Sequence, residues 1–137
     1  MKGRSSRTYR LNLSERGLAL YLSSHLRLCT LARDLLPYGA TLQAAIDLLA
    51  QRETEELAAD LLDDGLADLI GKGEHFVGGP SYLGRSARAI KERVSQSGLV
   101  HAPQIGRIYI AGLNCLSACE NREIGGLLAR LSTARNG

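Results

Sequence analysis

The sequence predicts a mainly α-helical, compact domain that contains a helix-turn-helix-like element and a short β-strand or wing. The 137 residues are 45% hydrophobic but only 4% aromatic, so the core must consist of Leu, Ala, Ile and Val, which favours packed helices over a β-sandwich. Apolar residues also recur at helical spacing in several segments. Because domains of roughly 100–150 residues are the most common, we expect one domain. We divide the chain into a basic flexible arm, residues 1–13, and a single mainly helical domain, residues 14–137.

Capping residues and helix breakers predict where the first helices begin and end. Ser14 is expected to cap a first helix that runs to about Leu36, where Pro37 stops it. Thr41 is expected to cap a second helix, and Thr54 to restart the helix after a bend. One side of the first helix should carry Leu18, Leu22, Leu28, Leu31 and Leu35. The second and third helices should bury Leu42, Ala45, Ile46, Leu49, Leu57, Ala58, Leu61 and Leu62.

The sequence of the second half of the chain predicts a loop, two helices and a strand. The glycine-rich segment 71–84 reads as a loop. Ser86 should begin a helix that Gly98 closes. The β-branched and aromatic segment Gly106–Ala111 is the best candidate strand, with Tyr109 bracing it. The last helix should follow a Ser117-x-x-Glu120 capping box and present Ile124, Leu127, Leu128 and Leu131, with Gly125-Gly126 indicating close packing against a neighbour.

Charge is sorted along the chain into blocks of alternating sign. Met1–Arg27 carries six basic residues and one acidic residue. Asp47–Glu74 carries nine acidic and two basic residues, and Arg85–Arg107 carries five basic residues and one acidic residue. The net charge of +3 conceals this pattern. Fields of alternating sign act on polyanions and on protein partners, so the pattern indicates the kind of partner to expect.

The basic blocks predict a bacterial, DNA-binding transcriptional regulator. A cationic helix over residues 86–97 followed by a strand is the order of a winged helix-turn-helix, in which the helix enters the major groove. The N-terminal arm would add phosphate contacts through counterion release. A solvated amphipathic helix packed against an edge strand is the alternative for this segment. The residues expected to contact double-stranded DNA are Arg4, Arg7, Arg10, Arg85, Arg88, Lys91, Arg93 and Arg107.

The acidic block allows a different function. Residues 53–64 would form a helix whose charged side repels phosphates and therefore does not enter DNA. This side is either a solvated surface or the working surface of a protein-binding adaptor or inhibitor. Contact between it and the basic block of a second copy would give a homo-oligomer. The residues expected to bind a protein partner are Glu53, Glu55, Glu56, Asp60, Asp63 and Asp64.

One segment resembles a known family. The stretch Ala32-Arg-Asp-Leu-Leu-Pro-Tyr-Gly-Ala-Thr-Leu-Gln43, followed by the helix Leu57–Leu62, is similar to the helix-turn-helix region of the flagellar master-regulator C subunit and its relatives on conjugative, mobile elements. The resemblance implies a DNA-binding activator subunit that works in a hetero-oligomer with another regulator. This chain departs from the family because the region matching the recognition helix is acidic. Cys115 and Cys119 also supply only two of the ligands of the family's zinc site.

We expect no enzymatic activity, cofactor or metal site. The sequence contains no Ser-His-Asp or Cys-His pattern with recognisable context and no phosphate-binding glycine motif. Its histidines, His25, His75 and His101, are scattered, and the three cysteines are expected to be small core residues of a cytoplasmic protein. The longest apolar stretch is interrupted by charged residues, so we expect no membrane span.

Overall fold

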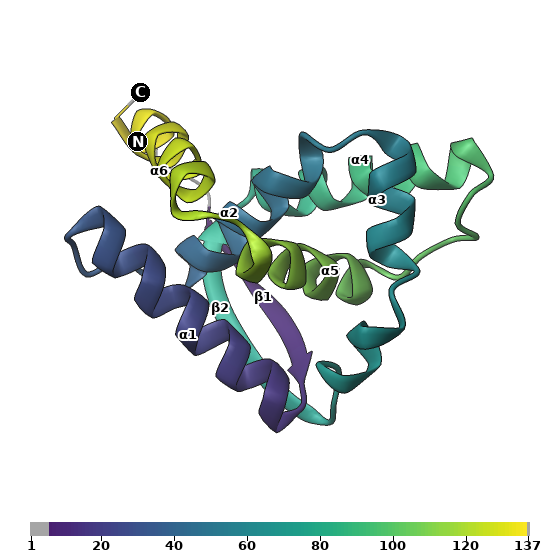
Figure 1. Ribbon diagram of the computed structural model, residues 1–137, viewed down its shortest axis with the longest axis horizontal. Helices are drawn as coiled ribbons and strands as arrows, with labels where there is room; N and C mark the ends of the chain where they lie inside the picture. Colours follow the sequence, from purple (N-terminus) through teal and green to yellow (C-terminus); the bar gives the residue numbers. More distant parts are fainter. Residues whose placement is uncertain (1–5, 137) are drawn as a thin grey trace.

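A computed structural model describes residues 6–136, with side chains described as far as Leu131. The described part contains six α-helices, one short 3-10 helix (η1) and a two-stranded antiparallel sheet (Figure 1). The predicted mainly helical domain with a small β element is confirmed. The elements in chain order are β1 (Ser6–Leu13), α1 (Glu15–Ala32), α2 (Gly39–Ala50), α3 (Thr54–Leu61), η1 (Asp64–Asp68), β2 (Gly73–Pro80), α4 (Tyr82–Ser97), α5 (Ile105–Ala118) and α6 (Asn121–Asn136).

Strands β1 and β2 pair along their whole length, from Ser6 opposite Pro80 to Leu13 opposite Gly73. Alternate residues of β1, namely Tyr9, Leu11 and Leu13, are buried, while the residues between them are exposed. The prediction of a flexible arm over residues 1–13 is therefore wrong for residues 6–13, and the predicted loop 71–84 contains β2. Both strands depend on pairing between residues that are sixty or more positions apart, which local composition does not reveal.

The strand predicted at Gly106–Ala111 is wrong, because these residues lie in helix α5. Ile108, Tyr109, Ile110 and Ala111 are consecutive and all buried, so this helix is enclosed around its circumference. Helix α5 contacts α1, α2, α3, α4, β1 and η1 (Figure 1). Burial on every side selects β-branched and aromatic residues here, and tertiary packing overrides their preference for strands. The expected wing is therefore absent from this segment.

Helix α1 begins as predicted and ends earlier than predicted. The Ser14 side chain accepts a hydrogen bond from the Gly17 N–H at 3.0 Å, which confirms the cap. Arg33 adopts a left-handed conformation with φ of 56° and ends the helix after Ala32. The expected stripe of five inward leucines is wrong, since only Leu28 among them is fully buried. The buried side of α1 consists of Gly17, Tyr21, Ser24, His25 and Leu28.

The remaining helices follow the sequence pattern with small shifts. Helix α4 starts at Tyr82, four residues before the predicted start, and ends at Gly98 with φ of 78°, as predicted. Ser117 lies inside α5, so the predicted capping box is wrong; the Glu120 N–H instead contacts the Glu123 side chain at the start of α6. The expected core positions are buried in α2, α3 and α6 except for Leu62, which is exposed, and Leu128, which is half-buried. Gly125 packs against nothing within 4 Å, contrary to the expected close contact.

Two helical glycines provide a matched test of this packing. A Cβ at Gly17 would lie 2.1 Å from the Leu69 carbonyl oxygen, whereas a Cβ at Gly125 would meet open space. Gly17→Ala should therefore lower the free energy of unfolding by roughly 2 kcal/mol or more. Gly125→Ala should raise it by about 0.5–1 kcal/mol, because Ala is the better helix former. Urea unfolding followed by circular dichroism measures both, and equal effects of the two changes would contradict this packing.

Candidate nucleic-acid interface

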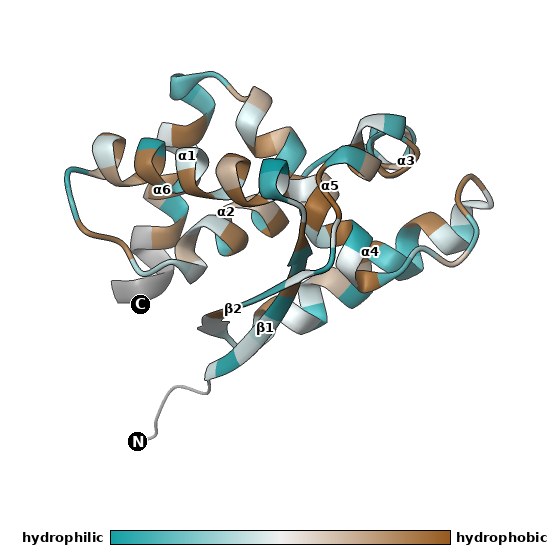
Figure 2. Ribbon diagram, turned by 90° about the horizontal axis from the view of Figure 1, so that it is seen from below, coloured by the Kyte–Doolittle hydropathy of each residue, from teal (hydrophilic) through white to brown (hydrophobic). Residues whose placement is uncertain are grey.

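The predicted DNA-binding helix is amphipathic, and its charged residues divide between three sides. Leu83, Ala87, Ile90 and Val94 form the buried stripe of α4. In Figure 2 hydrophilic and hydrophobic segments accordingly alternate along this helix. The outward side, opposite the buried stripe, carries Arg85, Ala89, Glu92 and Gln96, all of which are exposed. One flank carries Arg88 and Lys91, and the other carries Arg93.

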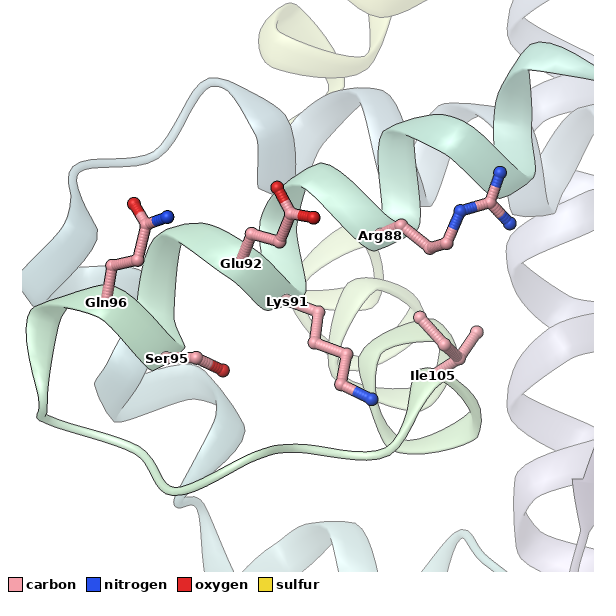
Figure 3. A pocket seen from close by; sticks show the side chains of 6 residues that line it. All are labelled: Arg88, Lys91, Glu92, Ser95, Gln96 and Ile105. Atoms are coloured by element: carbon pink, nitrogen blue, oxygen red, sulfur yellow. The ribbon is translucent and has the colours of Figure 1, made fainter.

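A hollow with a volume of about 380 Å³ lies beside α4, where the helix faces the start of α5. It is lined by Arg88, Lys91, Glu92, Ser95, Gln96 and Ile105. Figure 3 shows Lys91 extending toward Ile105, with Arg88 lying near the same end of α5, whereas Glu92 and Gln96 project from another side of the helix. Both cations therefore border this open hollow, with their charged groups pointing in different directions.

A tyrosine pair ties the first turn of α4 to the sheet. The Tyr9 hydroxyl donates to the Pro80 carbonyl at 2.5 Å and accepts from the Gly84 N–H at 3.3 Å. The Tyr9 ring meets Tyr109 of α5 edge-on, with ring centroids 6.2 Å apart. Burial raises the pKa of Tyr109, and the nearby Arg88 guanidinium offsets part of that rise. Tyr109 is thus a core residue that joins α5 to β1, rather than the brace of a strand.

Two of the predicted DNA contacts instead hold the fold together. The Arg93 guanidinium donates to the carbonyls of Ala50 and Arg52 and to the Thr54 hydroxyl, so it joins the end of α2 to the start of α3. The Arg107 side chain donates to the Leu61 carbonyl at 2.7 Å and to the Asp63 carbonyl at 3.3 Å, at the end of α3. Cations at helix C-termini satisfy free carbonyls and oppose the helix dipole. The assignment of Arg93 and Arg107 to DNA is therefore corrected to a structural role.

Only some of the N-terminal basic residues predicted to contact DNA are free of other contacts in the structure. Arg4 lies outside the described residues. Arg10 is on the exposed face of the ribbon and pairs with Glu74 at 3.3 Å. Arg7 is exposed and lies opposite Gly79, three residues before α4 begins. The pairing of β1 with β2 therefore brings Arg7 to the end of the ribbon from which α4 starts. One residue of the N-terminal basic block thus lies near the start of the second basic block.

Most of the predicted partner-binding acids already have local contacts. Glu53 and Glu56 form a reciprocal capping box at the start of α3. Asp60 forms an ion pair with Arg52 at 2.5 Å. Asp63 accepts from the Gly65 N–H at 2.8 Å. Of the six predicted acids, only Glu55 and Asp64 have side chains without a polar contact to the described part of the chain, so fewer of these carboxylates are free for a partner than the sequence indicates.

The structure contains a polar cluster between α1 and α2 that was not predicted from the sequence. In the buried His25 ring, Nδ1 is 2.8 Å from the Thr41 hydroxyl oxygen, and Nε2 is 3.5 Å from the Cys29 sulfur. The Tyr38 ring covers it, with ring centroids 4.8 Å apart. The spacing of four residues between His25 and Cys29 on one helix is the signal that would have revealed the contact. Cys29 is half-buried rather than a full core residue.

The other two cysteines are held as thiols. Burial and the neighbouring Asp60 carboxylate raise the pKa of Cys115 to about 12. Burial also raises the pKa of Cys119, with the Glu123 carboxylate adding to the effect. Among residues 6–131, no group of three or more His, Cys, Asp or Glu side chains is arranged to hold a metal ion. In the same part of the chain, no helix has the length and apolar character needed to cross a membrane.

Comparison of the chain with protein-family models, with curated proteins and with solved structures gave no match in any of the three. The resemblance to the flagellar master-regulator C subunit therefore stays a prediction. Functional interpretation depends on the geometry around α4.

The structural role of Arg93 predicts a clear stability difference within one helix. Arg93→Ala should lower the free energy of unfolding by roughly 1–3 kcal/mol, because carbonyls at the α2–α3 junction lose their donors. Arg85→Ala on the exposed side of the same helix should change it by no more than about 0.5 kcal/mol. Chemical unfolding of the two variants measures the contrast. A loss at Arg85→Ala equal to that at Arg93→Ala would contradict the assignment.

Proposed function

We propose that the protein binds double-stranded DNA through the exposed side of α4. The observation that carries this proposal is a cluster of uncommitted cations. Arg85, Arg88 and Lys91 of α4, and Arg7 at the adjacent end of β1, form no ion pair with any described residue. Several other arginines, among them Arg16, Arg52 and Arg130, have carboxylate partners. Unpaired cations on adjacent sides of one helix are suited to phosphates, since their binding releases counterions.

The shape of α4 supports a groove-binding role. The major groove is about 12 Å wide and admits one α-helix. The outward stripe of α4 has the spacing i, i+4, i+7 and i+11, so its residues point along one line. In this proposal Arg85 and Gln96 contact base edges, for which Arg–guanine and Gln–adenine pairs are the common geometries. Arg88 and Lys91 on the flank, together with Arg7, contact the phosphates of one strand.

The segment after α4 distinguishes the proposed DNA-binding element from a winged helix-turn-helix. This segment was expected to form the wing, but it contains the buried helix α5, which cannot reach DNA. A role in bacterial transcription regulation, and the cytoplasmic location that goes with it, stay predictions that depend on DNA binding. The adaptor or inhibitor alternative is less well supported, because four of the six acids that would carry it are engaged in caps and ion pairs.

Fluorescence anisotropy with a mixed-sequence duplex over a salt series tests the proposal. Log affinity should fall linearly with log salt, with a slope of about 0.9 for each phosphate neutralised. The double variant Arg85→Glu/Arg88→Glu should abolish binding at low salt. The double variant Lys72→Glu/Arg122→Glu is the matched control, because it changes the net charge equally at exposed residues without ion pairs.

The control should keep most of the affinity and a salt slope close to that of the unchanged protein. An equal loss of DNA affinity in both double variants would show that net charge alone determines binding. It would exclude α4 as the DNA-binding element. Absence of binding by the unchanged protein at low salt would sink the proposal itself. Circular dichroism of each variant establishes that the fold is retained.

A further inference from the structure

Helix α1 carries an apolar side that the described chain leaves uncovered. Leu26 is 67% exposed and Leu22 is 46% exposed, although both lie in the middle of a well-formed helix. They point away from the side that packs on the core, which contains Tyr21 and Leu28. Figure 1 shows α1 along one outer edge of the molecule. Two adjacent large leucines in such a position indicate a surface for another helix.

The residues along this side follow the spacing of a helix–helix seam. Alternating steps of four and three residues connect Glu15, Ala19, Leu22, Leu26 and Cys29 along the helix and reach Arg33, the left-handed residue that caps it. Cys29 is half-buried, with its sulfur 3.5 Å from His25 Nε2, so it borders this side rather than lying at its centre. This is the a/d repeat of helices that pack side by side at a small crossing angle. The seam spans the whole of α1, about 27 Å at 1.5 Å per residue. It is apolar or small in the middle and charged at both ends, with opposite signs.

The charges at the two ends define the orientation of the occupant. If a second α1 packs antiparallel about a twofold axis near Ser24, Leu22 opposes Leu26 of the second copy and Ala19 opposes Cys29. Glu15 then opposes Arg33 at both ends of the seam. A parallel pair would instead place Glu15 against Glu15 and Arg33 against Arg33, which is repulsive. The apolar and small layers fit either orientation, so the charged ends are what select the antiparallel arrangement.

Both charged residues are available for this contact. Neither Glu15 nor Arg33 forms an ion pair with a described residue, whereas the neighbouring Arg16 pairs with Asp68 at 3.6 Å. Leu35, which is 93% exposed, follows the end of α1 and adds apolar surface there.

We propose that this side of α1 is the interface of a homodimer in which two α1 helices pack antiparallel. The interface is isologous, because the same residues contribute from both copies. One helix pair buries less than the roughly 800 Å² per partner of a standard interface. The dimer is therefore expected to dissociate reversibly on dilution. This inference does not depend on DNA binding.

Sedimentation equilibrium of the full chain tests the proposal. The unchanged protein should show a concentration-dependent monomer–dimer equilibrium, and Leu22→Lys/Leu26→Lys should be monomeric at every concentration. Leu62→Lys is the control, because Leu62 is 58% exposed on another surface, and it should dimerise normally. A monomeric unchanged protein, or equal loss of the dimer in the control, would overturn the proposal. Circular dichroism should show every variant folded, since these leucines are exposed in the monomer.

Disulfide trapping tests the antiparallel register. In a Cys115→Ala/Cys119→Ala background, the further change Ala19→Cys should give a covalent dimer on mild oxidation, through a bond to Cys29 of the second copy. The same background without Ala19→Cys should stay uncrosslinked. Adding Cys29→Ser to the Ala19→Cys variant should abolish the crosslink. Ready crosslinking of Cys29 alone would indicate a parallel pair and overturn the orientation.

Charge exchange tests the ends of the seam. Glu15→Arg alone and Arg33→Glu alone should each raise the dimer dissociation constant by roughly tenfold, because each change creates two like-charge contacts in place of two ion pairs. The double variant Glu15→Arg/Arg33→Glu should bring the dissociation constant back toward that of the unchanged protein. Additive weakening in the double variant would show that these two residues do not meet across the interface.

Discussion

The enclosure of α5 is the constraint on which the rest of the molecule depends. A helix buried around its circumference requires every neighbour to meet it with apolar or small residues, and the neighbours satisfy this differently. Helix α2 approaches most closely at Gly112, where a Cβ would lie 3.0 Å from the Ala45 carbonyl oxygen. Strand β1 contributes Tyr9 against Tyr109, and α3 is held at its end by Arg107. One central helix therefore positions the ribbon, α2 and α3, and through Tyr9 it also positions the start of α4.

The arginines of the basic blocks are of two kinds that a charge count does not separate. Arg93 and Arg107 are bound to carbonyl oxygens at the ends of α2 and α3, whereas Arg85 and Arg88 of the same region remain in solvent. The difference arises from where each residue falls on its helix. Arg93 is on the flank of α4 that faces the α2–α3 junction, and Arg85 is on the outward side. The surface available to nucleic acid therefore includes only some residues of the basic block, namely the cations that do not bind other parts of the protein.

Local signals predicted what local interactions determine. The Ser14 cap, the Gly98 stop and the inward residues of α2 and α3 other than Leu62 follow from contacts within a few residues, and the structure confirms them. Strand β2 and helix α5 were missed for a common reason, since each owes its conformation to distant segments. A glycine-rich stretch becomes a strand because β1 pairs with it, and a β-prone stretch becomes a helix because it is enclosed. Likewise, which arginines of the site are free depends on carbonyls about forty residues away.

The leucines of α1 were misassigned for a different physical reason, and the error is informative. Leu22 and Leu28 are both apolar and six residues apart, which places them on different sides of a helix, so they cannot share one buried stripe. Only one side of α1 meets the core, and the apolar residues on the other side have the spacing of a helix–helix seam.

Helices α1 and α4 lie toward opposite ends of the molecule (Figures 1 and 2). An antiparallel dimer through α1 would thus place its two α4 surfaces at its far ends. Such a dimer would be suited to well-separated DNA segments rather than to half-sites one helical turn, about 34–36 Å, apart.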